Sequence, residues 1–388
     1  MFKHKYQILI FFLISSIISI YIPVFKEYII KGGADFQWSP SKLLFEGTNH
    51  YEFMLIETGE KIREKIILSQ MGEYLHGLYV LFYPFTIFDW ELAKYIWLIL
   101  NIYFLVAIPT MLCNHSGISN FLKLIIIFTF IISTVSKINI IMGQQTLLIL
   151  FFITLNYIKS SNTNQILVGI SYFKYTLGYV LFFDFLFSKK FNILFKSLIP
   201  SVIGWLLYSW ISKSSPFLTL FQPFQLAIEN HGNYESGLLN RLYFLSPIEN
   251  INVLGFKITS VVSLIASILI SIVCVYKVSK IKNNDLLKIS TLLLLPLIFL
   301  PNYGHNYILV LPLLVYSVKN FKLKSAKFSI LASVYMLFFY RGFEIYSIKF
   351  LNFFELSSFN ISIINFSIVY FKIVLLTGVF LINIYRRY

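Results

Sequence analysis

Charged side chains are scarce in this sequence: Asp, Glu, Lys and Arg make up 13% of its 388 residues, whereas apolar types make up 57%. So little charge is typical of chains that face lipid, and it excludes an ordinary water-soluble globular fold. Cysteine occurs only twice, at Cys113 and Cys274, and both residues fall within apolar runs. Neither a disulfide framework nor a thiolate metal site is therefore indicated.

The sequence also lacks the short motifs of nucleotide and metal chemistry. It contains no P-loop and no G-x-S-x-G elbow, and its six His residues show no metal-ligand spacing. Nucleotide-driven chemistry is therefore not supported. The net charge of +15 arises from Lys and Arg that stand between apolar runs, without a basic groove, so we expect no nucleic-acid partner.

Apolar runs long enough to cross a bilayer recur along the chain. A span needs roughly 17 to 25 predominantly apolar residues, and somewhat fewer where a helix is broken inside protein. We therefore predict an all-α polytopic membrane protein, with a single transmembrane domain over residues 1–388 and a bundle of about twelve helices. The predicted helices cover residues 7–25, 76–88, 91–113, 120–136, 143–158, 165–187, 192–211, 252–277, 286–300, 304–318, 326–341 and 361–385.

The basic residues predict which way the chain crosses the membrane. On this helix count most Lys and Arg fall on one side, so the positive-inside rule predicts that both termini are cytoplasmic. The signal is weaker over residues 114–164, where Lys123 and Lys159 favour the opposite parity. Two long polar connections, residues 26–75 and 212–250, then form a first and a second outer loop, and a protein that elaborates one face usually works there.

The first outer loop contains a candidate catalytic residue, Asp35, directly after Gly32 and Gly33. Ser39-Pro40 and Glu46-Gly47 give plausible start and stop signals for a short surface helix that would hold Asp35 at the mouth of the bundle. A carboxylate there can deprotonate a hydroxyl acceptor if burial or neighbours tune its pKa. The alternative is a solvated carboxylate at the membrane interface.

Lys174 is the second candidate, because it lies near the middle of the predicted helix 165–187. An ammonium group without a partner is costly at that depth, and an anionic phosphate would compensate it. The alternative is snorkelling or pairing with Asp184, although ten residues of helix separate the two by about 15 Å.

Three further segments could contribute polar groups. His305 lies in a polar break between two apolar runs, where it could donate to phosphate or carry a proton, although a lone loop His is often structural. Gln144 and its neighbour follow Gly143 and indicate either a polar helix start or an amide pair that binds sugar. In the second outer loop, Arg241 suits bidentate recognition of phosphate and follows Asn233, but it could equally be a solvated loop charge.

Taken in order, these segments resemble glycosyltransferase family 87, the polyprenol-phosphate-mannose-dependent group of the GT-C class. The matching pieces are Asp35-Phe36 followed by Gly47-Thr48-Asn49-His50-Tyr51, Tyr83-Pro84, Gly143-Gln144, Lys174, Gly232-Asn233 with Ser236, and Leu300-Pro301 through His305. Three positions depart from the family pattern: it has proline at His50 and serine at Leu300, and two prolines are common where this sequence has only Pro84. The sugar of such a divergent member need not be mannose.

The resemblance implies a GT-C-type bundle whose extracytoplasmic loops carry short surface helices, and an inverting glycosyltransferase. Such an enzyme would move a hexose or related sugar, mannose foremost, from a polyprenyl-phosphate donor to the hydroxyl of a lipid-linked or glycan acceptor. Its base would be Asp35, and neither a cofactor nor a metal is expected. The residues expected to bind the donor are Tyr51, Gln144, Lys174, Asn233, Arg241 and His305.

Two other functions fit a protein of this kind. A lipid-glycan flippase or transporter would need a through-path, commonly signalled by internal repeats, and no clear repeat is present. An outer-face glycan polymerase or ligase would instead use a diphosphate-linked oligosaccharide. The composition, rich in Ile, Lys and Asn, favours a bacterium and hence its inner membrane, and the expected partners are the donor, the acceptor and membrane lipids.

Overall fold

A computed structural model of the protein describes residues 2–57, 60–70, 72–231, 252–253, 256–281, 284–299, 304–339 and 374–384. Over these ranges the elements are helices, apart from one hairpin in which β1 (Asn252–Val253) pairs antiparallel with β2 (Phe256–Lys257). The prediction of an all-α fold is confirmed. The prediction that the helix begins at residue 252 is wrong, because Gly255 interrupts the helical pattern of the sequence there and α17 begins at Ile258.

The helices follow one another along the chain, with 3-10 segments marked η. They are α1 (Phe2–Lys31), α2 (Trp38–Phe45), α3 (His50–Ile56), α4 (Glu60–Lys65), η1 (Ile67–Ser69), α5 (Gly77–Leu81), α6 (Tyr83–Thr86), α7 (Trp90–His115), α8 (Asn120–Ile132), α9 (Thr134–Met142), α10 (Thr146–Ile158), α11 (Asn162–Leu167), η2 (Val168–Phe173), α12 (Tyr175–Phe187), α13 (Phe191–Ile211), α14 (Pro216–Thr219), α15 (Gln222–His231), α17 (Ile258–Ser279), α18 (Asp285–Phe299), η3 (Gly304–Val310), α19 (Leu311–Lys319), α20 (Lys324–Phe339) and a last helix, Val374–Ile384.

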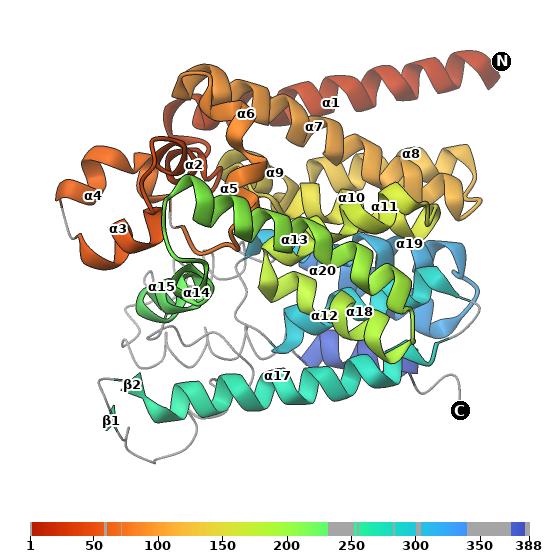
Figure 1. Ribbon diagram of the computed structural model, residues 1–388. Coiled ribbons are helices and arrows are strands. Elements are labelled where there is room, and N and C mark those ends of the chain that lie inside the picture. Colours follow the sequence, from red (N-terminus) through yellow and green to blue (C-terminus); the bar gives the residue numbers. More distant parts are fainter. Residues whose placement is uncertain are drawn as a thin grey trace, which may run out of the picture.

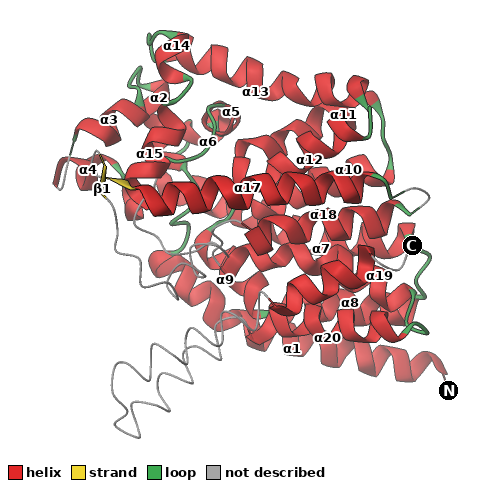
Figure 2. Cartoon of the chain, turned by 90° about the horizontal axis from the view of Figure 1, so that it is seen from below, coloured by secondary structure: helices red, strands yellow, loops and turns green. Residues whose placement is uncertain are grey.

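The short helices collect at one end of the bundle. In Figures 1 and 2, α2, α3, α4, α14 and α15 lie together at the left, while the start of α1 lies at the opposite end. The longer helices pack between these ends: α10 and α8 lie against α7, and α18 lies against α17 and α19. The first outer loop and residues 212–231, the described part of the second, are therefore neighbours in space.

Within the described residues, two helices are long and apolar enough to cross a membrane, α7 and α13, and the pair α8 and α9, bent by 53°, is a further candidate. Both α7 and α13 lie within one or two residues of their predicted bounds. They expose large apolar side chains such as Ile99 and Tyr103 on α7 and Phe195 and Ile203 on α13, as expected of surfaces that meet lipid. The predicted bundle of about twelve spans is not confirmed in the described residues.

Breaks inside predicted helices explain much of the difference between the predicted spans and the observed helices. The prediction of one helix over 165–187 is wrong, because the chain forms α11, η2 and α12 with Lys174 outside helical geometry (φ −100°, ψ 78°). The run 76–88 divides into α5 and α6 at Phe82, just before Pro84, which lacks a backbone N–H. Hydropathy reports how apolar a segment is, but it does not report whether the backbone hydrogen bonds of one helix run through the whole segment.

Two buried clusters hold the bundle together. The larger one occupies the centre, with fully buried side chains from α7, α10, α12, α18 and α19. The smaller one joins the outer segments to α13 and consists of Leu44, Tyr51, Tyr79, Tyr208 and Leu226. The first outer loop is therefore packed onto the bundle rather than suspended from it.

A buried ion pair links α12 to α18. The Lys288 ammonium lies 2.7 Å from the Asp184 carboxylate, both side chains are at most 4% exposed, and Lys288 also donates to Ser188 Oγ at 2.9 Å. Asp184 therefore pairs with Lys288 and not with Lys174, so the pairing of Lys174 with Asp184 that the sequence left open does not occur.

We expect Asp184→Asn to lower the free energy of unfolding by about 3–5 kcal/mol, because it leaves the Lys288 ammonium buried without its counter-charge. The double variant Asp184→Leu/Lys288→Met removes both charges and should recover most of that loss. Thermal unfolding of the purified protein in detergent micelles measures both effects. Equal destabilisation in the single and double variants would show that packing, not charge, accounts for the loss.

Candidate functional site

The chain leaves α1 in a tight loop that is held by the end of α9. Gly33 adopts a positive φ of 85°, and its N–H donates to the Ile141 carbonyl at 2.9 Å. The N–H of Asp35 donates to the Met142 carbonyl at 2.8 Å. Two consecutive carbonyls of α9 thus fix the backbone that carries Asp35.

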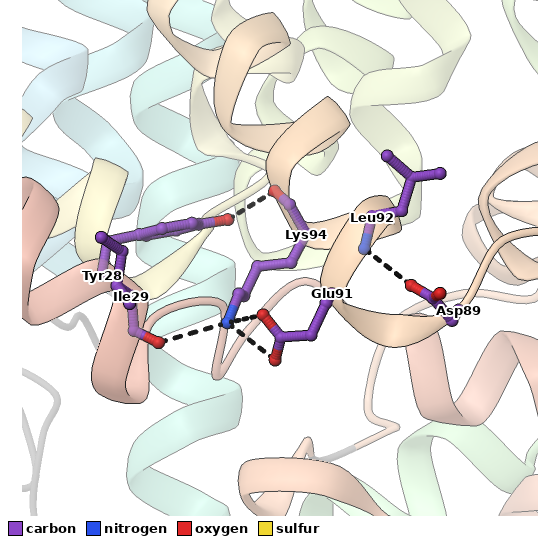
Figure 3. Close-up of polar contacts among 6 residues, drawn as sticks. All are labelled: Tyr28, Ile29, Asp89, Glu91, Leu92 and Lys94. Atoms are coloured by element: carbon purple, nitrogen blue, oxygen red, sulfur yellow. Dashed lines mark hydrogen bonds and ion pairs between the residues drawn. The ribbon is translucent and has the colours of Figure 1, made fainter.

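The start of α7 holds the last turn of α1, just before the loop that carries Asp35. Figure 3 shows Tyr28 donating to the Lys94 carbonyl at 2.7 Å, while the Lys94 ammonium lies 2.9 Å from Glu91 and 3.4 Å from the Ile29 carbonyl. Asp89 caps α7 by accepting from the N–H of Leu92 at 2.8 Å. The contacts of Tyr28 and Ile29 with Lys94 tie the last turn of α1 to the first turns of α7.

Gly143 and the two glutamines after it contact the first outer loop at Asp35. Gly143 ends α9 in the left-handed conformation (φ 66°), and its carbonyl accepts from the indole N–H of Trp97 at 2.8 Å. The side chain of Gln144 donates to the Asp35 carboxylate, and that of Gln145 donates to the Asp35 carbonyl. Both glutamines are buried, so Gly143 and its neighbours form part of the surroundings of Asp35.

Lys174 joins this arrangement from the break between η2 and α12. Its ammonium donates to Gln144 Oε1 at 3.2 Å, to Thr146 Oγ1 at 3.1 Å and to Asn306 Oδ1 at 3.2 Å. The residue is 8% exposed. Gln144 therefore lies between the two predicted candidates, accepting from Lys174 and donating to Asp35.

Asn306 brings η3 to the same point, because its Oδ1 also accepts from the hydroxyl of Thr146 at 3.2 Å. His305 is the second residue of η3, and its side chain lies outside the described residues. Thr146 and Asn306 each adjoin a segment that the sequence analysis singled out, but neither residue was predicted.

Two helices begin at this polar network. α10 starts at Thr146 and α12 at Tyr175, each has 13 residues, and no side chain in the described part of the chain caps either start. The first turn of a helix carries partial positive charge on N–H groups that have no partner within the helix. Together with the Lys174 ammonium, these two helix starts make the point suitable for an anion.

Burial controls the ionisation of Asp35. The pKa of its carboxyl group is raised to about 6. Removal from water is the largest cause, and the nearby negative charge of Glu73 also raises the pKa, whereas Lys174 and the hydrogen bond from Gln144 lower it. Asp35 nevertheless keeps partial exposure. A carboxyl group with such a pKa is ionised at neutral pH and remains basic enough to take a proton.

Glu73 was not predicted, although it lies in the first outer loop just before α5. The backbone beside it is fixed from three directions: the N–H of Tyr74 donates to the Tyr79 hydroxyl at 3.0 Å, the Tyr51 hydroxyl donates to the Tyr74 carbonyl, and the N–H of Leu75 donates to the Phe173 carbonyl at 2.9 Å. An acidic residue shortly before a predicted helix start is the only signal the sequence offers for it.

Tyr51 lies in the smaller buried cluster rather than beside Asp35. Its ring is fully buried and contacts the rings of His50, Tyr79 and Tyr208. Its hydroxyl donates to the Tyr74 carbonyl. The Tyr74 ring in turn lies 5.7 Å from the Lys174 ammonium. Tyr51 therefore holds the backbone of Tyr74, whose ring lies beside Lys174.

Asn233 and Arg241 lie outside the described residues. In the part that is described, no three His, Cys, Asp or Glu side chains gather closely enough to hold a metal ion. An open polar hollow lies between the ends of α7 and α19 and the start of α18, and it is lined by His115, Asp285 and Lys319 among others. This hollow lies at the end of α7 that is distant from Asp35.

The profile of glycosyltransferase family 87 matches residues 77–301, which is more than half of the chain. The chain belongs to glycosyltransferase family 87. It is accordingly a membrane glycosyltransferase, an enzyme that transfers a sugar from a donor to an acceptor. No curated protein and no solved structure gives a significant match.

The part of the chain that matches the glycosyltransferase profile runs from α5 to the end of α18. It includes Gln144 and Lys174, whereas Asp35, Tyr51 and His305 lie outside it. Membership of family 87 therefore rests on the central helices, and the inclusion of Asp35 in the site rests on its contact with Gln144.

We expect Gly143→Ala to lower the rate of sugar transfer about tenfold or more, because it displaces the first outer loop. A Cβ at Gly143 would lie 3.1 Å from the Cα of Gly33. Gly117→Ala is the matched control, since Gly117 has the same φ of 66° with nothing within 4 Å. Both variants should lose about 1–2 kcal/mol of stability to backbone strain, so equal transfer rates would contradict a role for this contact.

Proposed function

We propose that this glycosyltransferase moves a hexose or related sugar, mannose foremost, from a polyprenyl-phosphate donor to the hydroxyl of a lipid-linked or glycan acceptor. Transfer would take place at the end of the bundle where α2, α3, α14 and α15 gather, on the extracytoplasmic side of a bacterial inner membrane with both termini in the cytoplasm. The observation that supports this most is the bridge Asp35–Gln144–Lys174, which sets a carboxylate and a buried cation on opposite sides of one amide.

The proposed reaction is a single displacement at the anomeric carbon. The acceptor oxygen forms a bond to this carbon while its proton passes to Asp35, and the bond from the anomeric carbon to the phosphate oxygen breaks. The electron pair leaves with the lipid phosphate, which changes from a diester with one negative charge to a monoester with a second one. Attack from the face opposite the leaving group inverts the configuration of the sugar.

The charges of the site suit this change. A cation and helix starts aimed at the leaving phosphate stabilise the charge that develops in the transition state, and a site shielded from water strengthens that effect. The Lys174 ammonium and the starts of α10 and α12 supply these groups, and Thr146 and Asn306 hold the ammonium in place. Arg241, Asn233 and His305 remain proposed donor-binding residues, and Gln144 would hold Asp35 towards the acceptor.

We expect Asp35→Asn to fold normally and to lose sugar transfer by about 10²- to 10⁴-fold, because an amide cannot accept the acceptor proton. Asp89→Asn is the matched control, since Asp89 is exposed near the start of α7 and asparagine can also cap a helix. Product formation from polyprenyl-phosphate sugars in proteoliposomes measures both. Transfer by Asp35→Asn at the wild-type rate would show that another group is the base.

The wild-type protein should prefer a monophosphate-linked sugar over a diphosphate-linked oligosaccharide as donor. Lys174→Ala should weaken binding of the monophosphate donor at least tenfold, because about 1.4 kcal/mol or more of charge-assisted hydrogen bonding is lost. Lys65→Ala, in an exposed part of the first outer loop, is the control. Preference for the diphosphate donor would favour a glycan polymerase or ligase, and unchanged affinity in both Lys174→Ala and Arg241→Ala would contradict the phosphate site.

The pH dependence of transfer should report Asp35. Below its pKa of about 6 the carboxyl group is protonated and cannot act as a base, so kcat/KM should fall on the acidic side with a midpoint near that value. Glu73→Gln removes a negative charge that raises the Asp35 pKa, so the midpoint should move to lower pH. Glu46→Gln, an exposed carboxylate of the same loop, should leave it unchanged. An unshifted midpoint in Glu73→Gln would contradict the proposed proximity.

A further inference from the structure

The end of α13 and the two short helices after it expose an apolar surface. Phe217 is 82% exposed, Leu218 is 71% and Phe221 is 62%, and Trp210 in the last turn of α13 is 78% exposed. We call Trp210, Phe217, Leu218, Phe221 and Phe224 the outer apolar face. The indole N–H of Trp205 fixes it to α13 by donating to the Pro216 carbonyl at 3.0 Å.

The outer apolar face continues a surface that meets lipid. The exposed large side chains of α13 run along the helix up to Trp210, and they are Phe195, Ile199, Val202, Ile203, Leu206 and Leu207. Because α13 is long and apolar enough to cross a membrane, a hydrocarbon chain that follows this surface out of the bilayer reaches α14 and α15 without leaving apolar side chains.

The same face also reaches the site. The Phe224 ring of α15 lies 5.1 Å from the ring of Tyr175, which directly follows Lys174 and begins α12. Phe224 is 41% exposed, so its ring joins the open apolar surface to the first turn of α12. One end of this surface is therefore continuous with the exposed apolar side of α13, and its other end contacts Tyr175, the residue that follows Lys174.

The outer apolar face could either insert into the membrane interface or bind a ligand with a hydrocarbon chain, and its contact with Tyr175 favours the ligand. A helix that only anchors the protein in the membrane interface needs apolar side chains, but it needs no ring contact with the residue next to a buried cation. A ligand with a hydrocarbon chain and an anionic head matches both ends at once. On the basis of the proposed function, we propose that the outer apolar face binds the first isoprene units of the donor while Lys174 holds its phosphate.

The test compares two donors that carry the same sugar phosphate, one on a long polyprenyl chain and one on a short, water-soluble prenyl chain. We expect Phe224→Ala to raise KM for the long-chain donor about tenfold, the order expected when an aromatic contact with hydrocarbon is lost. The KM for the short-chain donor should change less than about twofold, because that donor depends chiefly on its phosphate contacts. Phe121→Ala, 46% exposed at the start of α8, is the control and should leave both values unchanged.

A second variant, Phe221→Ala, separates chain binding from damage to the fold, since Phe221 is more exposed than Phe224 and should show the same selective effect in weaker form. Equal losses with both donors, or no change with either, would overturn the inference while leaving the proposed function intact. Failure of the wild-type protein to transfer sugar from either donor would overturn the proposed function itself, and chain binding with it.

Discussion

An ammonium group buried among apolar helices is stable only where oxygen atoms and a negative charge surround it, and Lys174 imposes this condition on the protein. Its three oxygen partners come from the start of α10 and from η3, and its counter-charge comes from the loop after α1. Satisfying one cation therefore brings four distant segments together. The same meeting of segments buries Asp35, and burial raises the pKa of its carboxyl group although Lys174 lowers it. The geometry that stabilises the fold is therefore also the geometry that prepares a base opposite a cation.

Backbone geometry allows this meeting of segments. Glycine at positions 33 and 143 permits the positive φ angles by which the first outer loop lies against the end of α9, with little room between the two backbones. The break at Lys174 has a comparable effect, since it ends η2 and lets α12 begin at the polar network. Two uncapped helix starts and one cation then share a small volume, an arrangement that favours an anionic ligand over a neutral one.

The sequence predicted the class of fold and several residues of the site, for identifiable physical reasons. Long uninterrupted apolar runs located α7 and α13. An ionisable residue within an apolar run drew attention to Lys174, and a carboxylate directly after two glycines of the first outer loop drew attention to Asp35. Hydropathy did not report the break before α12, because a 3-10 segment and an α-helix can be equally apolar. Thr146 and Asn306 were missed because only the folded chain brings them to Lys174, and Glu73 was missed because only the folded chain brings it near Asp35. The predicted number of spans depended on runs that the structure divides into shorter helices.

In the proposed reaction, Lys174 holds the phosphate of a lipid-linked sugar opposite Asp35. A cryo-EM structure of the wild-type protein with a non-transferable phosphonate analogue of the donor tests it directly. We expect an anionic group within about 3–4 Å of the Lys174 ammonium, with the sugar ring on the side of Asp35. An analogue bound elsewhere, with Lys174 still engaged by Gln144, Thr146 and Asn306, would contradict it.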